Sequence, residues 1–159
     1  MENKERVVLV GANLNDNSDF LNSMIELASL ADAIDLEVVN SISQNVKEIT
    51  NNYYIGSGKV KEIKDYIKGK NIDIIIFNNE LSALQLKNLE DDFYTKVIDR
   101  TMLILEIFAR RARSKEAKIQ VELASLEYMR PKLIGSNINL DRQRGGKNKG
   151  VGEKFLELD

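Results

Sequence analysis

Residues suited to binding a polyanion gather near the carboxyl end of the chain, between Asp141 and Glu153. Four basic side chains and four glycines stand there with one apolar residue, Val151. Such a segment buries too little apolar surface to fold alone, whereas its positive charge and accessible backbone suit phosphate groups. We therefore predict a polyanion-binding loop rather than a plain linker. Its expected contact residues are Arg142, Gln143, Arg144, Gly145, Gly146, Lys147, Asn148, Lys149, Gly150 and Gly152.

A second basic group precedes this loop. Arg111, Lys115 and Lys118 follow the i, i+4, i+7 spacing of one helix face. We predict that this face of a long helix contacts nucleic acid, and an ordinary solvated face is the alternative. The full predicted group is Arg110, Arg111, Arg113, Lys115 and Lys118.

A third candidate resembles part of a nucleotide-binding loop. It consists of Gly56, Ser57, Gly58 and Lys59. The pattern G-x-x-x-x-G-K-[ST] requires glycine at position 53 and Ser or Thr at position 60, where this chain has Tyr53 and Val60. We therefore expect a turn into a helix whose first N–H groups bind anions only weakly.

Composition excludes several kinds of chemistry. The chain has no histidine and no cysteine, so it has neither a histidine general base nor a Cys/His zinc site. The D-x-x-G and N-K-x-D signatures of GTPases are also absent. Asn78-Asn79-Glu80 follows a strongly apolar run, and without a second catalytic group we interpret it as a loop. We expect this segment to have no catalytic activity, no bound metal and no cofactor of its own.

The first part of the chain alternates apolar runs with helical patterns. Strands are expected at 7–10, followed by Gly11, and at 36–42, 73–77 and 97–98, and residues 53–55 are a candidate for a further short strand. Between them, helical spacing indicates a helix capped by Ser18 that extends to about residue 33, a helix at 60–68 followed by Gly69 as its C-cap glycine, and a helix capped by Ser82. The predicted inner faces include Leu21, Met24, Ile25 and Ala28 in the first helix and Leu84, Leu86 and Leu89 in the last. This order predicts an α/β fold with a parallel sheet over residues 1–98.

Residues 99–159 have a different pattern. Thr101 is a candidate cap for a helix that continues to about residue 130, where Pro131 should end or kink it. Leu105, Ala112, Ile119, Leu126 and Leu133 recur every seven residues, beside a second stripe of Ala117, Val121, Ala124 and Tyr128. A returning antiparallel helix, starting near Phe155 and Leu156, would cover the seven-residue stripe. We therefore predict a helical hairpin with the basic loop at its tip, followed by a further domain beyond residue 159.

Several stretches resemble the HflX-type ribosome-associated GTPases. Tyr54–Val60 is similar to their Y-x-G-x-G-K-x-E-E-I signature. Val97–Thr101 with Leu103–Ala109 is similar to V-I-D-R-T-x-L-I-L-D-I-F-A, and Ala117–Ala124 with Leu126–Tyr128 matches A-K-L-Q-V-E-L-A-x-L-x-Y. These motifs extend over nearly the whole chain, and the last two are long and specific.

The resemblance implies an N-terminal α/β subdomain, a long helical hairpin and a GTPase domain that this chain does not contain. It implies that the full-length parent is a GTPase that binds GTP with magnesium, associates with the large ribosomal subunit, and splits or rescues ribosomes. The hairpin tip, which in this family reaches ribosomal RNA, maps onto Arg142–Glu153. This tip is one residue shorter than the family pattern S-R-Q-x-G-G-x-G-x-R-G-P-G-E and more basic, and Val151 replaces its proline.

Net charge and hydropathy complete these expectations. The chain has a net charge of −2, but residues 1–98 hold 10 basic and 16 acidic residues, against 13 and 9 in residues 99–159. Opposite net charges indicate different partners for the two parts. No apolar run approaches the roughly 20 residues of a membrane helix, and we therefore expect a cytoplasmic protein. We expect it to be a monomer, or a dimer formed through the incomplete hairpin. Two alternative functions are a purine-nucleotide-binding α/β domain and a helix-mediated protein-interaction module.

Overall fold

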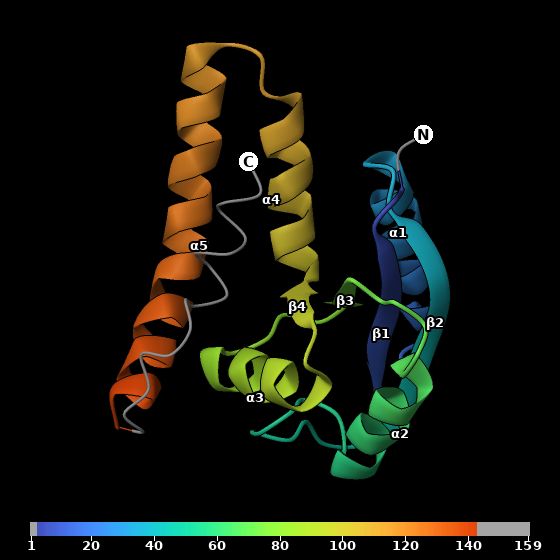
Figure 1. Ribbon diagram of the computed structural model, residues 1–159. Helices are drawn as coiled ribbons and strands as arrows, with labels where there is room; N and C mark the ends of the chain where they lie inside the picture. Colours follow the sequence, from blue (N-terminus) through green and yellow to red (C-terminus); the bar gives the residue numbers. More distant parts are fainter. Residues whose placement is uncertain (1–2, 143–159) are drawn as a thin grey trace.

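The computed structural model describes residues 3–142, with side chains up to Leu133. Strands and helices alternate along the chain, as the sequence predicts (Figure 1). The elements are β1 (Arg6–Leu14), α1 (Phe20–Ala33), β2 (Glu37–Val46), α2 (Ser57–Ile67), β3 (Ile74–Phe77), α3 (Ala83–Phe93), β4 (Lys96–Asp99), α4 (Arg100–Arg111) and α5 (Lys115–Arg142).

The four strands form one parallel sheet in the order β2-β1-β3-β4. The central strands β1 and β3 are apolar on both faces, and Val7–Val10 and Ile74–Phe77 are buried. This pattern is typical of strands covered by helices on both sides. The predicted α/β fold is therefore confirmed. Residues 53–55 form no strand, because only an isolated bridge joins Thr50 and Tyr54.

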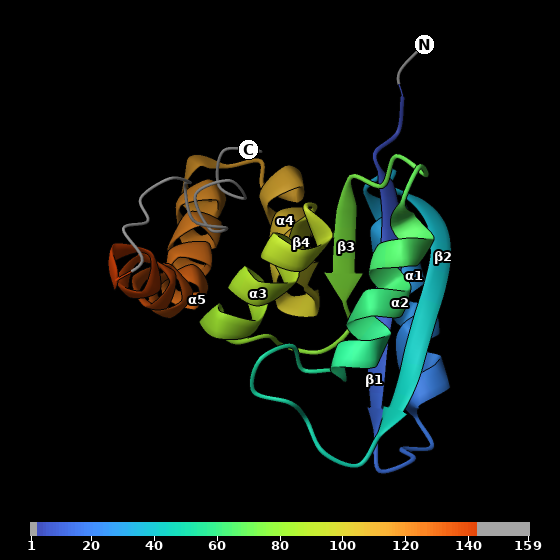
Figure 2. The ribbon, with the colours of Figure 1, turned by 60° about the horizontal axis from the view of Figure 1, so that its bottom comes forward.

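Helices cover both faces of the sheet (Figure 2). On one face, α1 packs against β1 and β2, and α4 lies beside α1 against β3 and β4. On the other face, α2 and α3 contact each other, and α3 packs against β4. The last helix, α5, packs against α3 and α4 and so lies beyond the β4 side of the sheet (Figures 1 and 2).

The helix boundaries follow local capping signals. The Ser82 hydroxyl accepts a hydrogen bond from the N–H of Gln85, whose side chain accepts one from the Ser82 N–H, so the predicted cap is confirmed as a reciprocal capping box. Gly69 follows α2 with φ +74°, the left-handed conformation that glycine adopts without cost. The cap of α1 is Asp19 rather than Ser18, and the cap of α4 is Asp99 rather than Thr101.

Two predicted apolar faces are partly wrong. In α1 the buried residues are Met24, Leu27 and Ala31, whereas Leu21 and Ile25 are 69% and 57% exposed. In α3, Leu86 and Leu89 are buried, and Leu84 is exposed. A helix that packs on a sheet buries one narrow stripe, and the apolar residues that flank this stripe remain at the surface.

The single long helix predicted for residues 101–130 is wrong. The helix ends at Arg111, and the Ser114 hydroxyl caps a new helix by accepting a hydrogen bond from the N–H of Ala117 at 3.0 Å. The resulting helices α4 and α5 run side by side in opposite directions (Figure 1). Pro131 lies inside α5 and does not end it.

Neither predicted apolar stripe of α5 is buried as a whole. Tyr128 of one stripe and Leu133 of the other pack against the core, whereas Ala124 and Leu126 are exposed. Met129 is buried and Tyr128 is half-buried against the core, on the side that faces α3 and α4. Ile119, Leu123 and Leu126 are 49%, 54% and 41% exposed. The predicted returning helix from about residue 152 lies outside the described residues, so its pairing with the seven-residue stripe stays a prediction.

Candidate functional site: the basic turn and the joint that positions it

The second basic group lies at the turn between α4 and α5. Arg110 and Arg111 end α4, Arg113 lies in the connection, and Lys115 and Lys118 belong to the first turns of α5. The three residues Arg111, Lys115 and Lys118 therefore do not share one helix face, and that part of the prediction is wrong. The break at 112–114 instead gathers the group at one end of the helical pair (Figure 1). We call this group the basic turn.

The basic turn has a strong positive charge. Five basic residues and one acidic residue, Glu116, occupy positions 110–118. Arg110 is held internally, since its Nε donates to Glu106 at 2.8 Å and a terminal nitrogen donates to the carbonyl of Ile34 at 3.3 Å. Within residues 3–133, no ion pair involves the other four side chains, which are exposed. These four cations are therefore available to a polyanion.

The predicted polyanion-binding loop, residues 142–152, lies mostly outside the residues that the structure describes. Arg142 is the last residue of α5, its side chain is not described, and residues from Gln143 onward lie outside the described part. Because α5 runs away from the basic turn, Arg142 lies at the opposite end of the helix (Figure 1). The 28 residues of α5 separate these two ends by roughly 42 Å.

Gly56 is the N-cap of α2, and Ser57–Lys59 already belong to the helix, which therefore begins three residues earlier than predicted. The segment follows a loop rather than a strand. The Gly56 N–H donates to the Gln44 side chain at 3.0 Å. Lys59 forms an ion pair with Glu62 at 2.8 Å, and Val60 is buried where a nucleotide-binding loop would have a hydroxyl for magnesium. These residues do not fit a GTP–magnesium site, and the weak anion site at this turn stays a prediction.

The carboxyl edge of the sheet is held by internal hydrogen bonds. The Arg100 guanidinium donates to the Asn78 side chain at 2.8 Å and to the Ser23 carbonyl at 3.2 Å, and it pairs with Glu26. The Asn79 side-chain oxygen accepts from the N–H of Ala12 at 3.0 Å. Ligands of open α/β sheets commonly bind at this edge, but here Asn78 and Asn79 connect strands and helices.

Asp99 connects three parts of the fold, and the sequence patterns did not predict this role. We call its contacts with Met102, Leu81 and Tyr128 the joint. The Asp99 carboxylate is fully buried at the end of β4 and accepts hydrogen bonds from the N–H groups of Met102 (3.0 Å) and Leu81 (3.1 Å). It also accepts a hydrogen bond from the Tyr128 hydroxyl of α5 at 2.6 Å. One carboxylate thus holds the start of α4, the loop before α3 and the middle of α5.

Lys132 strengthens the same joint. Its ammonium group donates to the Leu81 carbonyl at 2.8 Å and lies 4.3 Å from the centre of the Tyr128 ring. Burial raises the pKa of the Tyr128 hydroxyl well above its ordinary value, and the hydrogen bond to the Asp99 carboxylate raises this pKa further. Tyr128 therefore remains a neutral donor in the folded protein. In the sequence, the position of Asp99 directly before a helical pattern was the signal that could have identified this residue.

Acidic clusters and long apolar helices are two further features that indicate a function where they occur. Among the described residues, no group of three or more acidic side chains is placed to hold a metal ion. No helix within residues 3–142 combines the length and apolar character needed to cross a bilayer.

Comparison with known proteins identifies the class to which this fold belongs. Residues 21–109 match the family described as "GTP-binding GTPase N-terminal", and residues 111–159 match "GTP-binding GTPase Middle Region". A solved GTP-binding protein from Sulfolobus solfataricus, in complex with GDP, superposes with a TM-score of 0.64 at 25% identity. The match covers 97% of this chain and 45% of that protein.

Curated relatives define the family more narrowly. The chain is 45% identical over 157 residues to the GTPase HflX of Alkalihalophilus pseudofirmus and 38% identical over 156 residues to that of Escherichia coli. Each match covers 98% of this chain, but only 37% and 36% of the relative. The chain belongs to the HflX-type GTPase family and corresponds to the N-terminal region of its members, which confirms the resemblance of the sequence motifs.

Proposed function

We propose that this chain is the ribosome- and rRNA-binding N-terminal module of an HflX-like GTPase that associates with the large ribosomal subunit and splits or rescues ribosomes. The observation that carries the proposal is the set of four exposed cations of the basic turn, which no ion pair of the described part neutralises. A polyanion such as rRNA supplies the phosphates that these cations attract. Family membership supports the same partner.

Two basic regions share the binding in this proposal. The basic turn contacts phosphates at one end of α5, and the predicted loop from Arg142 onward contacts rRNA at the other. Lysine and arginine bind phosphate groups without reading the sequence, and glycines let a backbone approach closely. The sheet domain, residues 1–98 in the predicted division, is the platform, and residues 99–159 are the projecting arm.

The full-length parent in this proposal binds GTP and magnesium and hydrolyses GTP in a domain beyond residue 159. The present segment contributes no catalytic residue, because Gly56–Lys59 does not fit that chemistry. Its partners are the large ribosomal subunit and the GTPase domain of its own full-length chain. We place the protein in the cytoplasm, where ribosomes translate mRNA.

Co-sedimentation with purified large ribosomal subunits tests the proposal. One variant changes Arg111, Arg113, Lys115 and Lys118 to Glu, and a second changes Arg142, Arg144, Lys147 and Lys149 to Glu. A control changes two exposed lysines away from both basic regions, Lys61 in α2 and Lys68 directly after it, to Glu. We expect the unmodified chain and the control to pellet, and both reversal variants to pellet less.

A salt series completes this experiment. Binding through phosphates weakens steeply as salt rises, so the fraction that pellets should fall between low and physiological ionic strength. Equal pelleting of all variants would contradict the assigned contacts. If the unmodified chain never pellets with the large subunit, this segment is not a ribosome-binding module by itself.

A second candidate function rests on the exposed stripe of Ile119, Leu123 and Leu126. Apolar side chains at helical spacing on an open face suit a partner helix. A protein-interaction module would use this stripe, and changing its three residues to Lys should then abolish capture of the partner without affecting pelleting with ribosomes. The nucleotide-binding alternative is tested by titrating ATP and GTP against the fluorescence of Tyr53 and Tyr54.

A further inference from the structure

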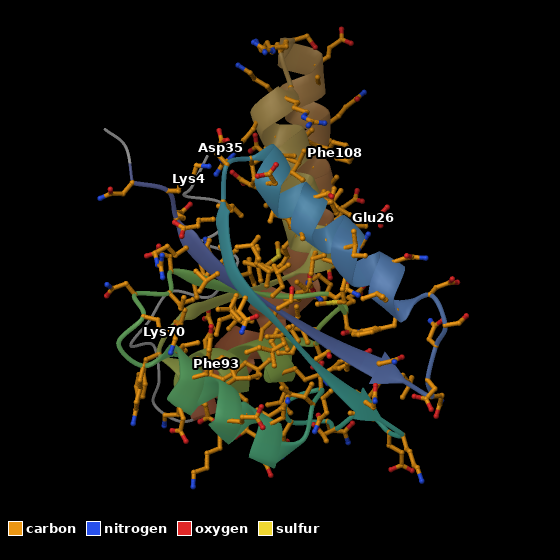
Figure 3. All side chains as sticks on the ribbon, turned by 90° about the vertical axis from the view of Figure 1, so that its right-hand side faces the viewer. Lys4, Glu26, Asp35, Lys70, Phe93 and Phe108 are labelled. Carbon is orange, nitrogen blue, oxygen red and sulfur yellow. The ribbon has the colours of Figure 1, made fainter. Side chains whose placement is uncertain are left out.

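Strand β2 forms an edge of the sheet with an open outer side. It pairs only with β1 in the order β2-β1-β3-β4, and among the described elements its main contacts are with β1 and α1. Viewed from the β2 side, the strand lies in front, with α1 and α2 to either side of it and no described element over it (Figure 3). A long open edge presents unpaired backbone groups that another strand can pair with.

The outward backbone groups are those of Ser41, Ser43 and Asn45. The carbonyl of Val46 accepts from the N–H of Asn15, which follows β1, so the groups of Val46 point toward β1. Successive residues of a strand point their N–H and C=O groups to opposite sides, and the three odd-numbered residues therefore point outward. The N–H of Ser41 agrees with this assignment, since it donates to the Asn40 side chain at 2.8 Å rather than to β1.

This edge has little of the usual protection against pairing. The ten residues of β2 contain no proline, lysine or arginine, and the one charged residue is Glu37 at its start. A bulge interrupts the ladder between Val38 and Asn40, which leaves Asn40–Val46 as a regular stretch. Natural edge strands are commonly blocked by charges, proline or bulges along their length, and here such a block exists only at the amino end.

We propose that β2 pairs in antiparallel orientation with β2 of a second copy of this chain, about a two-fold axis at Ile42, to give a continuous eight-stranded sheet. In this register Ile42 lies opposite its own copy, Ser41 opposite Ser43, and Asn40 opposite Gln44. The outward groups of Ser41 and Ser43 then form two hydrogen-bonded pairs related by the symmetry axis. Toward the ends, Glu37 approaches Lys47 of the copy, and no like charges meet.

The helices above the sheet fit the same arrangement. Because α1 contacts both β1 and β2, its axis lies above the space between these two strands. In the proposed pair, the α1 axis of the second copy therefore lies two strand spacings from the α1 axis of the first. Two spacings of about 4.8 Å give about 9.6 Å, which falls within the 8–10 Å at which helices pack. The α1 helices would therefore pack directly against each other.

Two exposed apolar side chains stand on the flank of α1 that this packing covers. Leu21 and Ile25 are four residues apart on the side of α1 opposite to Ser23, whose carbonyl accepts from Arg100 of α4. That flank faces away from α4 and therefore toward the β2 edge. These side chains are 69% and 57% exposed in a single copy, whereas in the pair they lie between the two α1 helices.

Cysteine cross-linking tests the register, because the chain has no cysteine of its own. Residues opposite each other in a non-hydrogen-bonded antiparallel pair have Cβ atoms about 4.5–5.5 Å apart, near the range that a disulfide bridges. We expect Ile42→Cys to form a disulfide-linked dimer under mild oxidation. The matched control Ile119→Cys, on α5, should remain monomeric on a non-reducing gel.

Sedimentation velocity across a concentration series tests the interface. Ser43→Pro removes an outward N–H and leaves the ladder with β1 intact, so the dissociation constant of the dimer should rise roughly tenfold or more. Leu21→Lys with Ile25→Lys should give a monomer. The control pair Ile119→Lys with Leu126→Lys should leave the dimer unchanged, and far-ultraviolet circular dichroism verifies that each variant is folded.

Amide hydrogen exchange distinguishes pairing of β2 with a second copy from pairing of β2 with another segment of its own chain. In the proposed dimer, protection of the Ser43 and Asn45 amides rises with protein concentration. A chain that remains monomeric at every concentration overturns the proposal. So does a dimer that only the α5 variants disrupt, and so does protection of these amides in the monomer, which would show that the edge pairs within its own chain.

Discussion

The hydroxyl of Tyr128 lies 2.6 Å from the carboxylate of Asp99 and joins the middle of α5 to the point where β4 ends and α4 begins. Asp99 is fully buried and adjoins Arg100, which binds the start of α1 and the end of β3. Two consecutive residues thus fix helices on opposite sides of the last strand. The position of α5, and with it that of the basic turn, depends on this joint.

Replacing Tyr128 with Phe should destabilise the protein by about 1–3 kcal/mol. The change removes a hydrogen bond to a buried carboxylate, and the acceptor cannot be solvated in compensation. Urea unfolding monitored by circular dichroism measures the loss. Hydrogen exchange should locate it in α5, where amide protection falls first.

The matched control is Tyr94→Phe, since the Tyr94 side chain is 85% exposed. This variant removes the same hydroxyl from a solvated position and should change the free energy of unfolding by less than about 0.5 kcal/mol. Equal losses in the two variants would show that the contact between Tyr128 and Asp99 is not a stabilising joint.

Alkaline pH should weaken the same contact. The pKa of Tyr128 is raised in the folded protein above its ordinary value of 10.0, so above about pH 10 the unfolded chain releases a proton that the folded chain retains. Stability from this group is complete below pH 10 and is lost as pH rises further. In urea titrations, the difference in stability between the unmodified chain and Tyr128→Phe should narrow above pH 10. A constant difference would contradict the assignment.

Gly11→Ala should be destabilising by about 1–3 kcal/mol. A Cβ atom at this position in β1 would lie 2.5 Å from the Met24 sulfur and 2.9 Å from a ring carbon of Phe20. Both side chains belong to α1, so the helix must shift or its side chains must leave their rotamers. Thermal unfolding should show a lower Tm.

Gly58→Ala should have the opposite effect, and it serves as the comparison for Gly11→Ala. No atom lies within 4 Å of a Cβ atom built at Gly58, and the residue is in the first turn of α2. Alanine restricts the unfolded chain and favours a helix, so stability should rise by about 0.4–1 kcal/mol. A loss of stability here would indicate that the free backbone of Gly58 is used by a contact.

Neutralising two cations of the basic turn should reduce the salt dependence of RNA binding. For Arg113→Gln with Lys115→Gln, the slope of log K against log salt should become shallower by about 0.7–0.9 for each lost phosphate contact. Filter binding with a fragment of large-subunit rRNA at several salt concentrations measures this slope. Lys61→Gln with Lys68→Gln, in and directly after α2, should leave the slope unchanged, and an equal change in both pairs would indicate a diffuse charge effect.

The strands of the sheet could be predicted from the sequence because the central strands are apolar at consecutive positions. Runs such as Ile74–Phe77 are buried on both faces, so their positions are apolar without interruption, and the glycine and serine caps at Gly69 and Ser82 mark the neighbouring helices. These are local signals. They predicted the alternation of strands and helices, and the HflX motifs predicted the family.

The candidate site was predicted less well, because its geometry depends on contacts between distant residues. The seven-residue periodicity from Leu105 to Leu133 suggested one helix, yet the hydroxyl of Ser114 starts a new one and reverses the chain. Ser114 was available as a cap signal, but the apolar pattern continued across it. The joint between Asp99 and Tyr128 spans 29 residues, and no local spacing identifies such a pair.

Strand β1 is synthesised before the other three strands of the sheet, and yet it lies at the centre of the sheet. Val7 pairs with Ile74, 67 residues further along the chain, so one side of β1 has no partner until β3 leaves the ribosome. At the usual rates of translation this interval is roughly 3–13 s. During that time Val7–Val10 is an apolar segment open to chaperones and to wrong partners, and the strand synthesised first of the four is among the last to acquire its native neighbours.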